Sequence, residues 1–199
     1  MRLQRIKAEY GEKVSISWKS YPLLPQSVPG RRPSAHTQEG RLRAARQEPS
    51  IVFKPWGSAD LPSSSLPALE SARCAERQGA ETMERFHMLL FRAYFEESRD
   101  ISRRQVLVEL AEEAGLAVEQ FEAELNSGAQ RSVVMREYAE AVARFGVSSI
   151  PTAIFNEKLA LIGAVPIEEY RHLIDGMLAG EPGGVAPWAE PQDKEPGQP

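Results

Sequence analysis

The sequence predicts an α/β fold that is mostly helical, and three parts of the 199-residue chain support this. Apolar and polar residues alternate strictly in KVSISWK (13–19), which is typical of a half-buried strand. Residues 68–150 contain no proline, so long helices can form there. TAIF (152–155) and LALIG (159–163) then flank the polar turn 156–158, a pattern that predicts a β-hairpin.

The first third of the chain is predicted to hold little regular structure besides the strand. A short helix opens it, because apolar residues recur at helical spacing until Gly11 ends the pattern. These apolar residues are Leu3, Ile6 and Tyr10. Residues 21–62 are rich in proline and serine and are expected to be irregular, with one short helix over 37–48 that Gly40 weakens.

Five helices are predicted in the proline-free stretch, because apolar residues recur at helical spacing and a glycine follows most of the periodic segments. They span 66–78, 80–96, 103–114, 117–126 and 129–145. Ser102 and Gln105 have the spacing of a capping box at the start of the third. A last helix is expected from about 167 to 178, and the proline-rich tail 181–199 is expected to be disordered.

Composition and charge exclude several classes of protein. The chain is 42% hydrophobic and 26% charged, which excludes global disorder, collagen-like sequences and coiled coils. The net charge is −4, and most of it comes from the tail, so nucleic acid and anionic membrane are not expected partners. No apolar run approaches ~18 residues and no signal peptide is visible, so a cytoplasmic protein without a membrane helix is predicted.

Cysteine chemistry is limited by the single cysteine, Cys74. One thiol excludes an intrachain disulfide, and no metal site is predicted because Cys-based zinc sites need several ligands. Cys74 stands inside a predicted helix between Ala72 and Ala75. A small buried apolar side chain is the favoured interpretation, and a reactive thiol is the alternative.

Other polar and aromatic residues each allow two interpretations. His87 lies on a stripe of Phe, Leu and Met, which favours a core or cleft-edge histidine over an acid–base catalyst. Phe53 and Trp56 fit ordinary loop packing, with substrate contact as the alternative. Five arginines favour a solvated basic face, since no nucleic-acid recognition motif accompanies them. They are Arg31, Arg32, Arg41, Arg43 and Arg46.

The most specific segment is FGVSSIPTAIF (145–155), where a proline opens a strand. Ile150-Pro151-Thr152 before a hairpin and a terminal helix resembles the cis-proline loop of the thioredoxin fold, and the helical block before it resembles the insertion of DsbA-like proteins. Further similar motifs are SWKSYPLLP (17–25), FKPW (53–56), CAERQG (74–79), FHMLLFRAYFEESRDIS (86–102) and IGAVP (162–166). Over residues 1 to about 179 the chain resembles cytosolic bacterial DsbA-family thiol oxidoreductases, which are related to 2-hydroxychromene-2-carboxylate isomerases.

The resemblance implies an α/β, thioredoxin-like fold with a large all-helical insertion, N-terminally truncated in this chain. It divides the sequence into a partial thioredoxin-like part (1–66), the helical insertion (67–146), a C-terminal thioredoxin-like part (147–179) and a disordered tail (180–199). In the family a strand and a Cys-x-x-Cys pair precede the first helix. The pair would lie about one to two turns upstream of Arg2, and a start codon placed too far downstream would explain its absence.

The resemblance therefore implies a thiol–disulfide oxidoreductase that is redox-inactive in this chain, and no catalytic residue is assigned. The alternatives are a non-catalytic binding module and a glutathione-dependent isomerase-like protein. The implied partner is a protein or small-molecule thiol or disulfide; no cofactor is expected except that glutathione is left open, as is the oligomeric state. The implied substrate-binding residues are Phe53, Trp56, His87, Ser149, Ile150, Pro151 and Thr152, with the Ile150–Pro151 bond cis.

Overall fold

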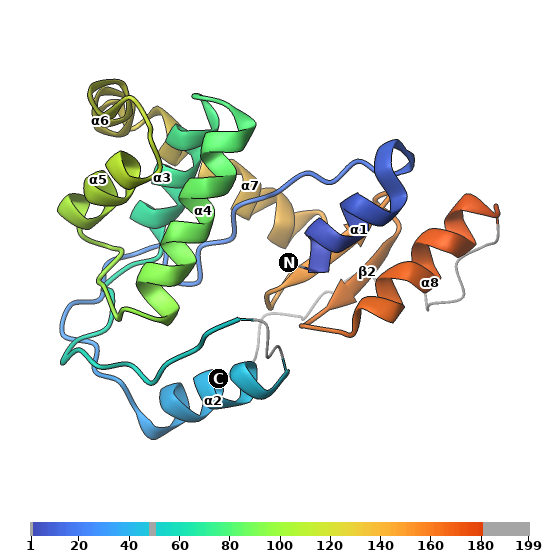
Figure 1. The fold of residues 1–199 in the computed structure, drawn as a ribbon, viewed down its shortest axis with the longest axis horizontal. Helices are drawn as coiled ribbons and strands as arrows, with labels where there is room; N and C mark the ends of the chain where they lie inside the picture. Colours follow the sequence, from blue (N-terminus) through green and yellow to red (C-terminus); the bar gives the residue numbers. More distant parts are fainter. Residues whose placement is uncertain (1, 48–50, 181–199) are drawn as a thin grey trace, which may run out of the picture. The chain divides into compact units, whose positions relative to one another are not determined.

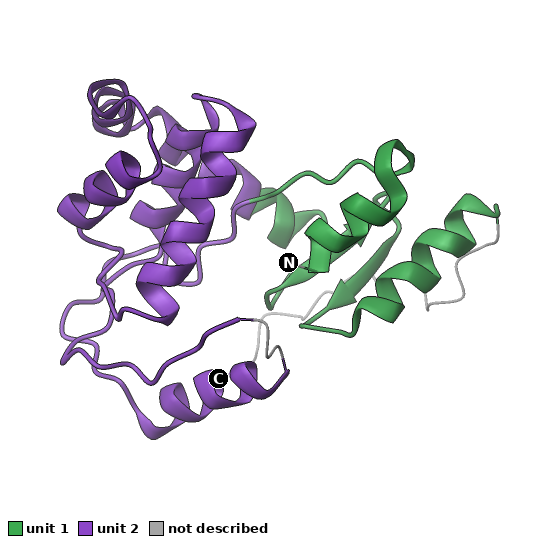
Figure 2. Cartoon of the chain, viewed as in Figure 1, with its two compact units in different colours: residues 1–19, 139–199 green, residues 20–138 purple. Residues whose placement is uncertain are grey.

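The computed structural model describes residues 2–47 and 51–180, and helices dominate them (Figure 1). The chain divides into two compact units, which Figure 2 colours separately. Unit 1 takes in the described residues of 1–19 and 139–199, and unit 2 those of 20–138. The partition predicted from the resemblance, with boundaries at 66 and 146, stays a prediction. The predicted disorder of the tail falls on 181–199, outside the described residues.

Unit 1 consists mainly of a β-hairpin and two helices, one from near each end of the sequence. Its elements are α1 (Arg2–Tyr10), the 3₁₀ turn η1 (Gly11–Lys13), β1 (Thr152–Phe155), β2 (Leu159–Ile162) and α8 (Ile167–Leu178). The strands are antiparallel, with Thr152 opposite Ile162 and Phe155 opposite Leu159. Asn156 and Glu157 both have positive φ, at 46° and 60°, as a type I′ turn requires. The predicted hairpin and both predicted helices are confirmed.

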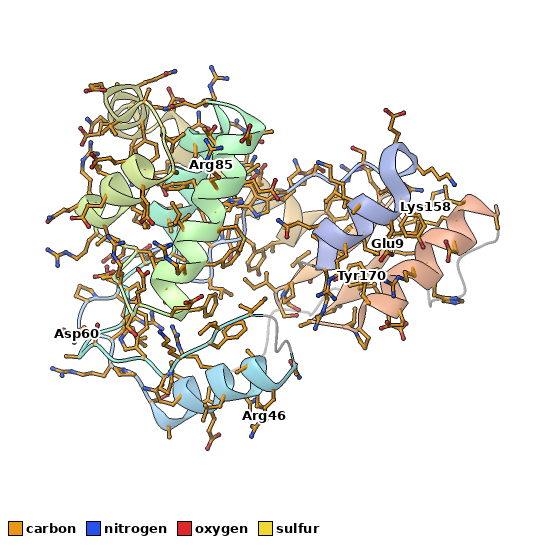
Figure 3. All side chains as sticks on the ribbon, in the orientation of Figure 1. Glu9, Arg46, Asp60, Arg85, Lys158 and Tyr170 are labelled. Atoms are coloured by element: carbon orange, nitrogen blue, oxygen red, sulfur yellow. The ribbon has the colours of Figure 1, made fainter. Side chains whose placement is uncertain are left out.

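One face of this hairpin forms the core of unit 1. Leu159 and Leu161 alternate with outward residues along β2, so both point to the same buried side. They cluster with residues from both helices, namely Ile6, Tyr170, Leu173 and Ile174. Burying each large aliphatic side chain contributes about 1.5–3 kcal/mol to the free energy of folding. The helices also pair at the surface, where Glu9, labelled in Figure 3, accepts hydrogen bonds from Arg171 at 2.6 and 2.8 Å.

The strand predicted over 13–19 is wrong. Lys13 ends η1, and residues 14–19 follow without regular structure. A strand exists only where a neighbour accepts and donates its backbone hydrogen bonds. Among the described residues the one sheet consists of β1 and β2, and neither pairs with this segment. The alternation survives only in part, since Val14 packs against the core of unit 1 while Ile16 is exposed.

Unit 2 is helical throughout its regular elements. They are α2 (Ala35–Gln47), α3 (Leu66–Glu76), α4 (Ala80–Phe95), α5 (Arg104–Glu113), α6 (Val118–Ser127) and α7 (Ala129–Ala143), of which residues up to Tyr138 belong to this unit. α3 packs against α4, α5 and α6 (Figure 1). The fully buried large side chains of this block come from the predicted apolar stripes. They include Phe86, Leu107, Leu110, Phe121 and Val134.

A terminating glycine explains the end of α6, whereas α3, α4, α5 and α6 all begin without a side-chain cap hydrogen bond. Gly128 has a φ of 67° and ends α6 in the left-handed conformation expected of a C-terminal glycine. The predicted capping box of Ser102 and Gln105 does not form, because the Ser102 hydroxyl donates to Asp100 and its backbone lies outside the helix. α5 begins at Arg104 without a side-chain cap.

The weakly predicted helix 37–48 is present as α2 and starts two residues earlier. Ser34 and Thr37 cap it reciprocally, since the Ser34 hydroxyl accepts the Thr37 amide at 3.1 Å and the Thr37 hydroxyl accepts the Ser34 amide at 3.4 Å. This is the geometry of a capping box with threonine in the third position.

Candidate functional site

The loop that enters β1 has the predicted cis bond between Ile150 and Pro151, which confirms that prediction. Ser149, Ile150 and Pro151 are exposed, and Thr152 is partly exposed. The Thr152 hydroxyl donates to the Ser149 carbonyl at 2.7 Å, and the Pro151 carbonyl accepts the Gly163 amide at 2.7 Å. The four loop residues thus form one accessible turn in unit 1, anchored to the end of β2.

The aromatic loop of unit 2 is only partly accessible. Trp56 is 4% exposed, and its indole N–H donates to the carbonyl of Asp60, which Figure 3 labels, at 3.1 Å. Phe53 is partly exposed and packs edge-to-face on Phe95, with ring centroids 4.9 Å apart. Of the two predicted contact residues, Trp56 therefore supports the loop from inside, while Phe53 offers an accessible ring edge.

His87 lies on α4 beside a row of aromatic rings. Its ring centroid is 6.5 Å from that of Phe91, which stacks on Phe95 at 6.1 Å. Burial lowers the pKa of His87 below its usual range, and the nearby positive charge of Arg73 lowers it further. The environment therefore favours the neutral imidazole.

Phe91 is the residue of this surface that sequence reasoning missed. It is 54% exposed, although it belongs to the stripe of Phe, Leu and Met on which His87 lies. Together His87, Phe91, Phe95 and Phe53 form an aromatic row on unit 2. The structure thus gathers two of the predicted contact residues, Phe53 and His87, in this row, whereas the predicted residues 149–152 belong to unit 1. The signal in the sequence was the width of the apolar stripe on residues 80–96, which has more large apolar residues than one buried face can hold.

Cys74 has the environment of an inert thiol. Its side chain is 1% exposed within α3. Burial raises its pKa to about 12, and the negative charges of Glu124 and Glu70 act in the same direction. Since the thiolate is the nucleophile in disulfide exchange, this position opposes reaction. The interpretation as a small buried apolar residue is confirmed.

A buried ion pair that the sequence did not reveal joins three segments of unit 2. Arg73 Nη2 lies 2.5 and 2.6 Å from the two carboxylate oxygens of Glu137, and Glu137 also accepts the Ser20 amide at 2.9 Å. Burial raises the pKa of Glu137, but the hydrogen bonds from Ser20 and Arg73 and the charge of Arg73 together hold it below its usual range. The carboxylate stays ionised and links α7 to α3.

The predicted solvated basic face is wrong for Arg41, which is 5% exposed. Its guanidinium group lies among aromatic rings and backbone carbonyls of unit 2. By contrast, Arg46, labelled in Figure 3, and Arg43 are exposed on the same helix as predicted. Sequence spacing could not distinguish them, because the acceptors of Arg41 lie far along the chain.

Across residues 2–47 and 51–180, no group of three or more His, Cys, Asp or Glu side chains has an arrangement that could hold a metal ion. In the same ranges no helix combines the length and the apolarity needed to cross a bilayer.

Comparisons with known proteins agree with this fold. In sequence, the chain is 27% identical over 194 residues to the ClpXP adapter protein SpxH of Halalkalibacterium halodurans, covering 90% of this chain and 62% of that relative's length. The probable DsbA oxidoreductase SCO1869 from Streptomyces coelicolor has a similar structure, with a TM-score of 0.73 and 19% identity over 92% of this chain and 84% of that one.

Two more solved structures share the fold. A protein described as a protein disulfide isomerase from Nitrosomonas europaea gives a TM-score of 0.69 at 17% identity, over 90% of this chain and 89% of that one. The cytosolic disulfide reductase DsbM from Pseudomonas aeruginosa gives 0.66 at 19% identity, over 89% and 90%. The family model of the DSBA-like thioredoxin domain matches residues 1–175. The chain therefore belongs to the DSBA-like thioredoxin domain family.

Proposed function

We propose that this chain is a thiol–disulfide oxidoreductase by descent whose 199 residues bind substrate without carrying out dithiol exchange. The observation that carries the proposal is the state of its single cysteine. Cys74 is buried in α3 with a pKa raised to about 12. Exchange through an intramolecular disulfide needs two thiols, so one thiol cannot complete the cycle within one chain.

The electrostatics of Cys74 also oppose a one-thiol reaction. With a pKa of about 12, the thiolate fraction at pH 7 is on the order of 10⁻⁵. An incoming disulfide would in addition have to reach a sulfur that the helical core covers. Both terms act in the same direction, so intermolecular exchange at Cys74 is slow as well.

Two surfaces support substrate binding. In unit 1, Ser149, Ile150, Pro151 and Thr152 form an accessible turn beside β1. In unit 2, the aromatic row presents the exposed ring of Phe91. Apolar side chains next to exposed backbone suit an extended protein segment better than nucleic acid. These surfaces favour a protein segment as the partner, and the family resemblance is the ground for proposing that the partner, protein or small molecule, carries a thiol or disulfide.

Catalysis is tested by insulin reduction with dithiothreitol as the reductant. We expect turbidity to develop at the rate without protein, for both the native chain and Cys74→Ala. Turnover above that rate that disappears in Cys74→Ala would contradict the proposal. A heterologous DsbA-family reductase serves as the positive control.

Binding is tested separately with a reduced, carboxymethylated insulin B chain as the probe. We expect Phe91→Ala to weaken binding by about tenfold, because it removes an exposed apolar contact worth about 1–2 kcal/mol, and Ile150→Ala tests the surface of unit 1 separately. Leu178→Ala is the matched control, since Leu178 is 51% exposed but lies outside both surfaces. If all three substitutions weakened binding equally, the binding would be nonspecific hydrophobic association, which would contradict the proposal.

An adapter role is a second candidate, supported by the similarity to SpxH over 90% of this chain. Such a role needs binding and no dithiol chemistry, which fits the buried Cys74. Sedimentation of the chain with purified ClpXP is the direct measurement. Co-sedimentation that Phe91→Ala abolishes supports the adapter role, and no co-sedimentation at micromolar concentrations rejects it.

A further inference from the structure

Arg41 of α2 is buried. Among the described residues, the groups that accept its hydrogen bonds are not carboxylates. Nη1 donates to the carbonyls of Lys54 and Phe95, both at 3.0 Å, and Nη2 donates to the carbonyl of Tyr94 at 2.9 Å. The acceptors are all backbone carbonyls. A planar guanidinium group is the side chain that can donate to several such oxygens at once.

The same guanidinium group is enclosed by three aromatic rings. The Arg41 Cζ atom lies 5.0 Å from the ring centroid of Trp56, 4.7 Å from that of Tyr94 and 5.3 Å from that of Phe95. These distances are within the ~6 Å range of cation–π attraction. Two of the accepting carbonyls, those of Tyr94 and Phe95, also belong to the last turn of α4, where the helix dipole favours a cation.

Polar contacts, more than apolar packing, hold α2 in place. Besides Arg41, Gln38 pairs with the Trp56 backbone in both directions, donating to its carbonyl at 3.1 Å and accepting its amide at 2.8 Å. Leu42, the large aliphatic residue of α2, is 47% exposed. A helix whose large apolar residue faces solvent gains little from burial, so α2 is held mainly by these polar contacts, and a ligand that replaces them can displace it.

We propose that Lys54, Trp56 and the last turn of α4 form a guanidinium-binding site, which Arg41 fills from within the chain. The ligand class is an arginine side chain, recognised by carbonyl oxygens, aromatic faces and a helix C-terminus together. An arginine presented by a protein partner competes with Arg41 for this site and displaces α2. The proposal depends only on unit 2 and does not rest on the proposed redox or adapter function.

The first test empties the site in the full chain with Arg41→Ala and titrates methylguanidinium. The indole N–H resonance of Trp56 reports on binding, because that group lies in the site's wall and donates to Asp60. We expect a saturable shift in Arg41→Ala, a weaker one with methylammonium, and none in the native chain. Arg43→Ala, which removes an exposed arginine of the same helix, is the control and should behave as the native chain.

Folding of Arg41→Ala is read from amide hydrogen exchange of α3–α7. If these helices keep their protection and the Trp56 signal does not respond to methylguanidinium, the proposal is wrong. If they lose protection, a second variant decides. Gln38→Ala keeps Arg41 and removes two hydrogen bonds to Trp56, so the amides of α2 should exchange about tenfold faster.

In Gln38→Ala, N-acetylarginine amide should accelerate the exchange of α2 amides further, because it competes with Arg41 for the open site. N-acetyllysine amide at the same concentration is the control and should leave the exchange rate unchanged. An equal response to both compounds, or to neither, overturns the assignment of a guanidinium site.

Discussion

At the residue scale, Arg73 is the point where three separate segments of unit 2 meet. Its guanidinium group binds Glu137 of α7 and Glu76 of α3, and Glu137 in turn accepts the amide of Ser20. Arg73 and Glu137 are both largely buried, with side chains 8% and 10% exposed. A buried ion pair is sensitive to loss of one partner, and without Glu137 the buried Arg73 would keep only Glu76, whose side chain is 45% exposed, as a counter-ion.

Glu137→Ala should therefore lower the free energy of unfolding by about 3–5 kcal/mol, measured by urea denaturation. The matched control is Arg144→Ala, which removes the exposed pairs with Glu140 and Glu157, where each side chain is more than a third exposed, and a contact with the Phe145 ring. That change should cost less than about 1 kcal/mol. If both variants lowered the free energy of unfolding by similar amounts, the buried pair would stabilise the fold no more than an exposed one.

The same carboxylate predicts a dependence of stability on pH. The pKa of Glu137 is lower in the folded chain than the ordinary value of 4.5. Its stabilisation is thus fully present above about pH 4.5 and is lost as the pH falls through the lower, folded value. The urea midpoint of the native chain should fall more steeply than that of Glu137→Gln between pH 5 and pH 3, in about the range where carboxylates titrate. Parallel curves would contradict the assignment.

At the element scale, two glycines in helical surroundings should respond oppositely to alanine. Gly128 has a φ of 67° between α6 and α7, whereas Gly40 lies within α2, and a Cβ at either position meets no heavy atom within 4 Å. Only the backbone conformation differs. Gly128→Ala should destabilise by about 1–2 kcal/mol, and Gly40→Ala should stabilise by about 0.5–1 kcal/mol. Thermal denaturation measures both, and the same sign for both would refute the argument.

At the scale of the whole molecule, each unit has its own apolar core. Leu161 belongs to the core of unit 1, and Phe121 is fully buried in unit 2. Leu161→Ala and Phe121→Ala should each cost about 2–5 kcal/mol. Hydrogen exchange should show the loss of protection first in β1, β2 and α8 for Leu161→Ala, and first in α3–α6 for Phe121→Ala. Uniform loss in both variants would mean that the two cores unfold as one.

The sequence by itself determined the helices, the hairpin and the presence of a single thiol. Helical periodicity and terminating glycines such as Gly128 are local signals, so they predict an element without knowledge of its neighbours. The final helix at Ile167–Leu178 matches its predicted range for this reason. The count of one cysteine likewise needs no structure.

Only the tertiary structure decided the features that depend on distant partners. Segment 13–19 has the alternation of a strand but no described strand to pair with, and Ser102 bonds to Asp100 instead of capping α5. Arg41 looks like its exposed neighbours in sequence. It is buried because its guanidinium group donates to the carbonyls of Tyr94 and Phe95, more than fifty residues away. Side-chain type and spacing set what a residue can bind, and the fold decides which partner lies within reach.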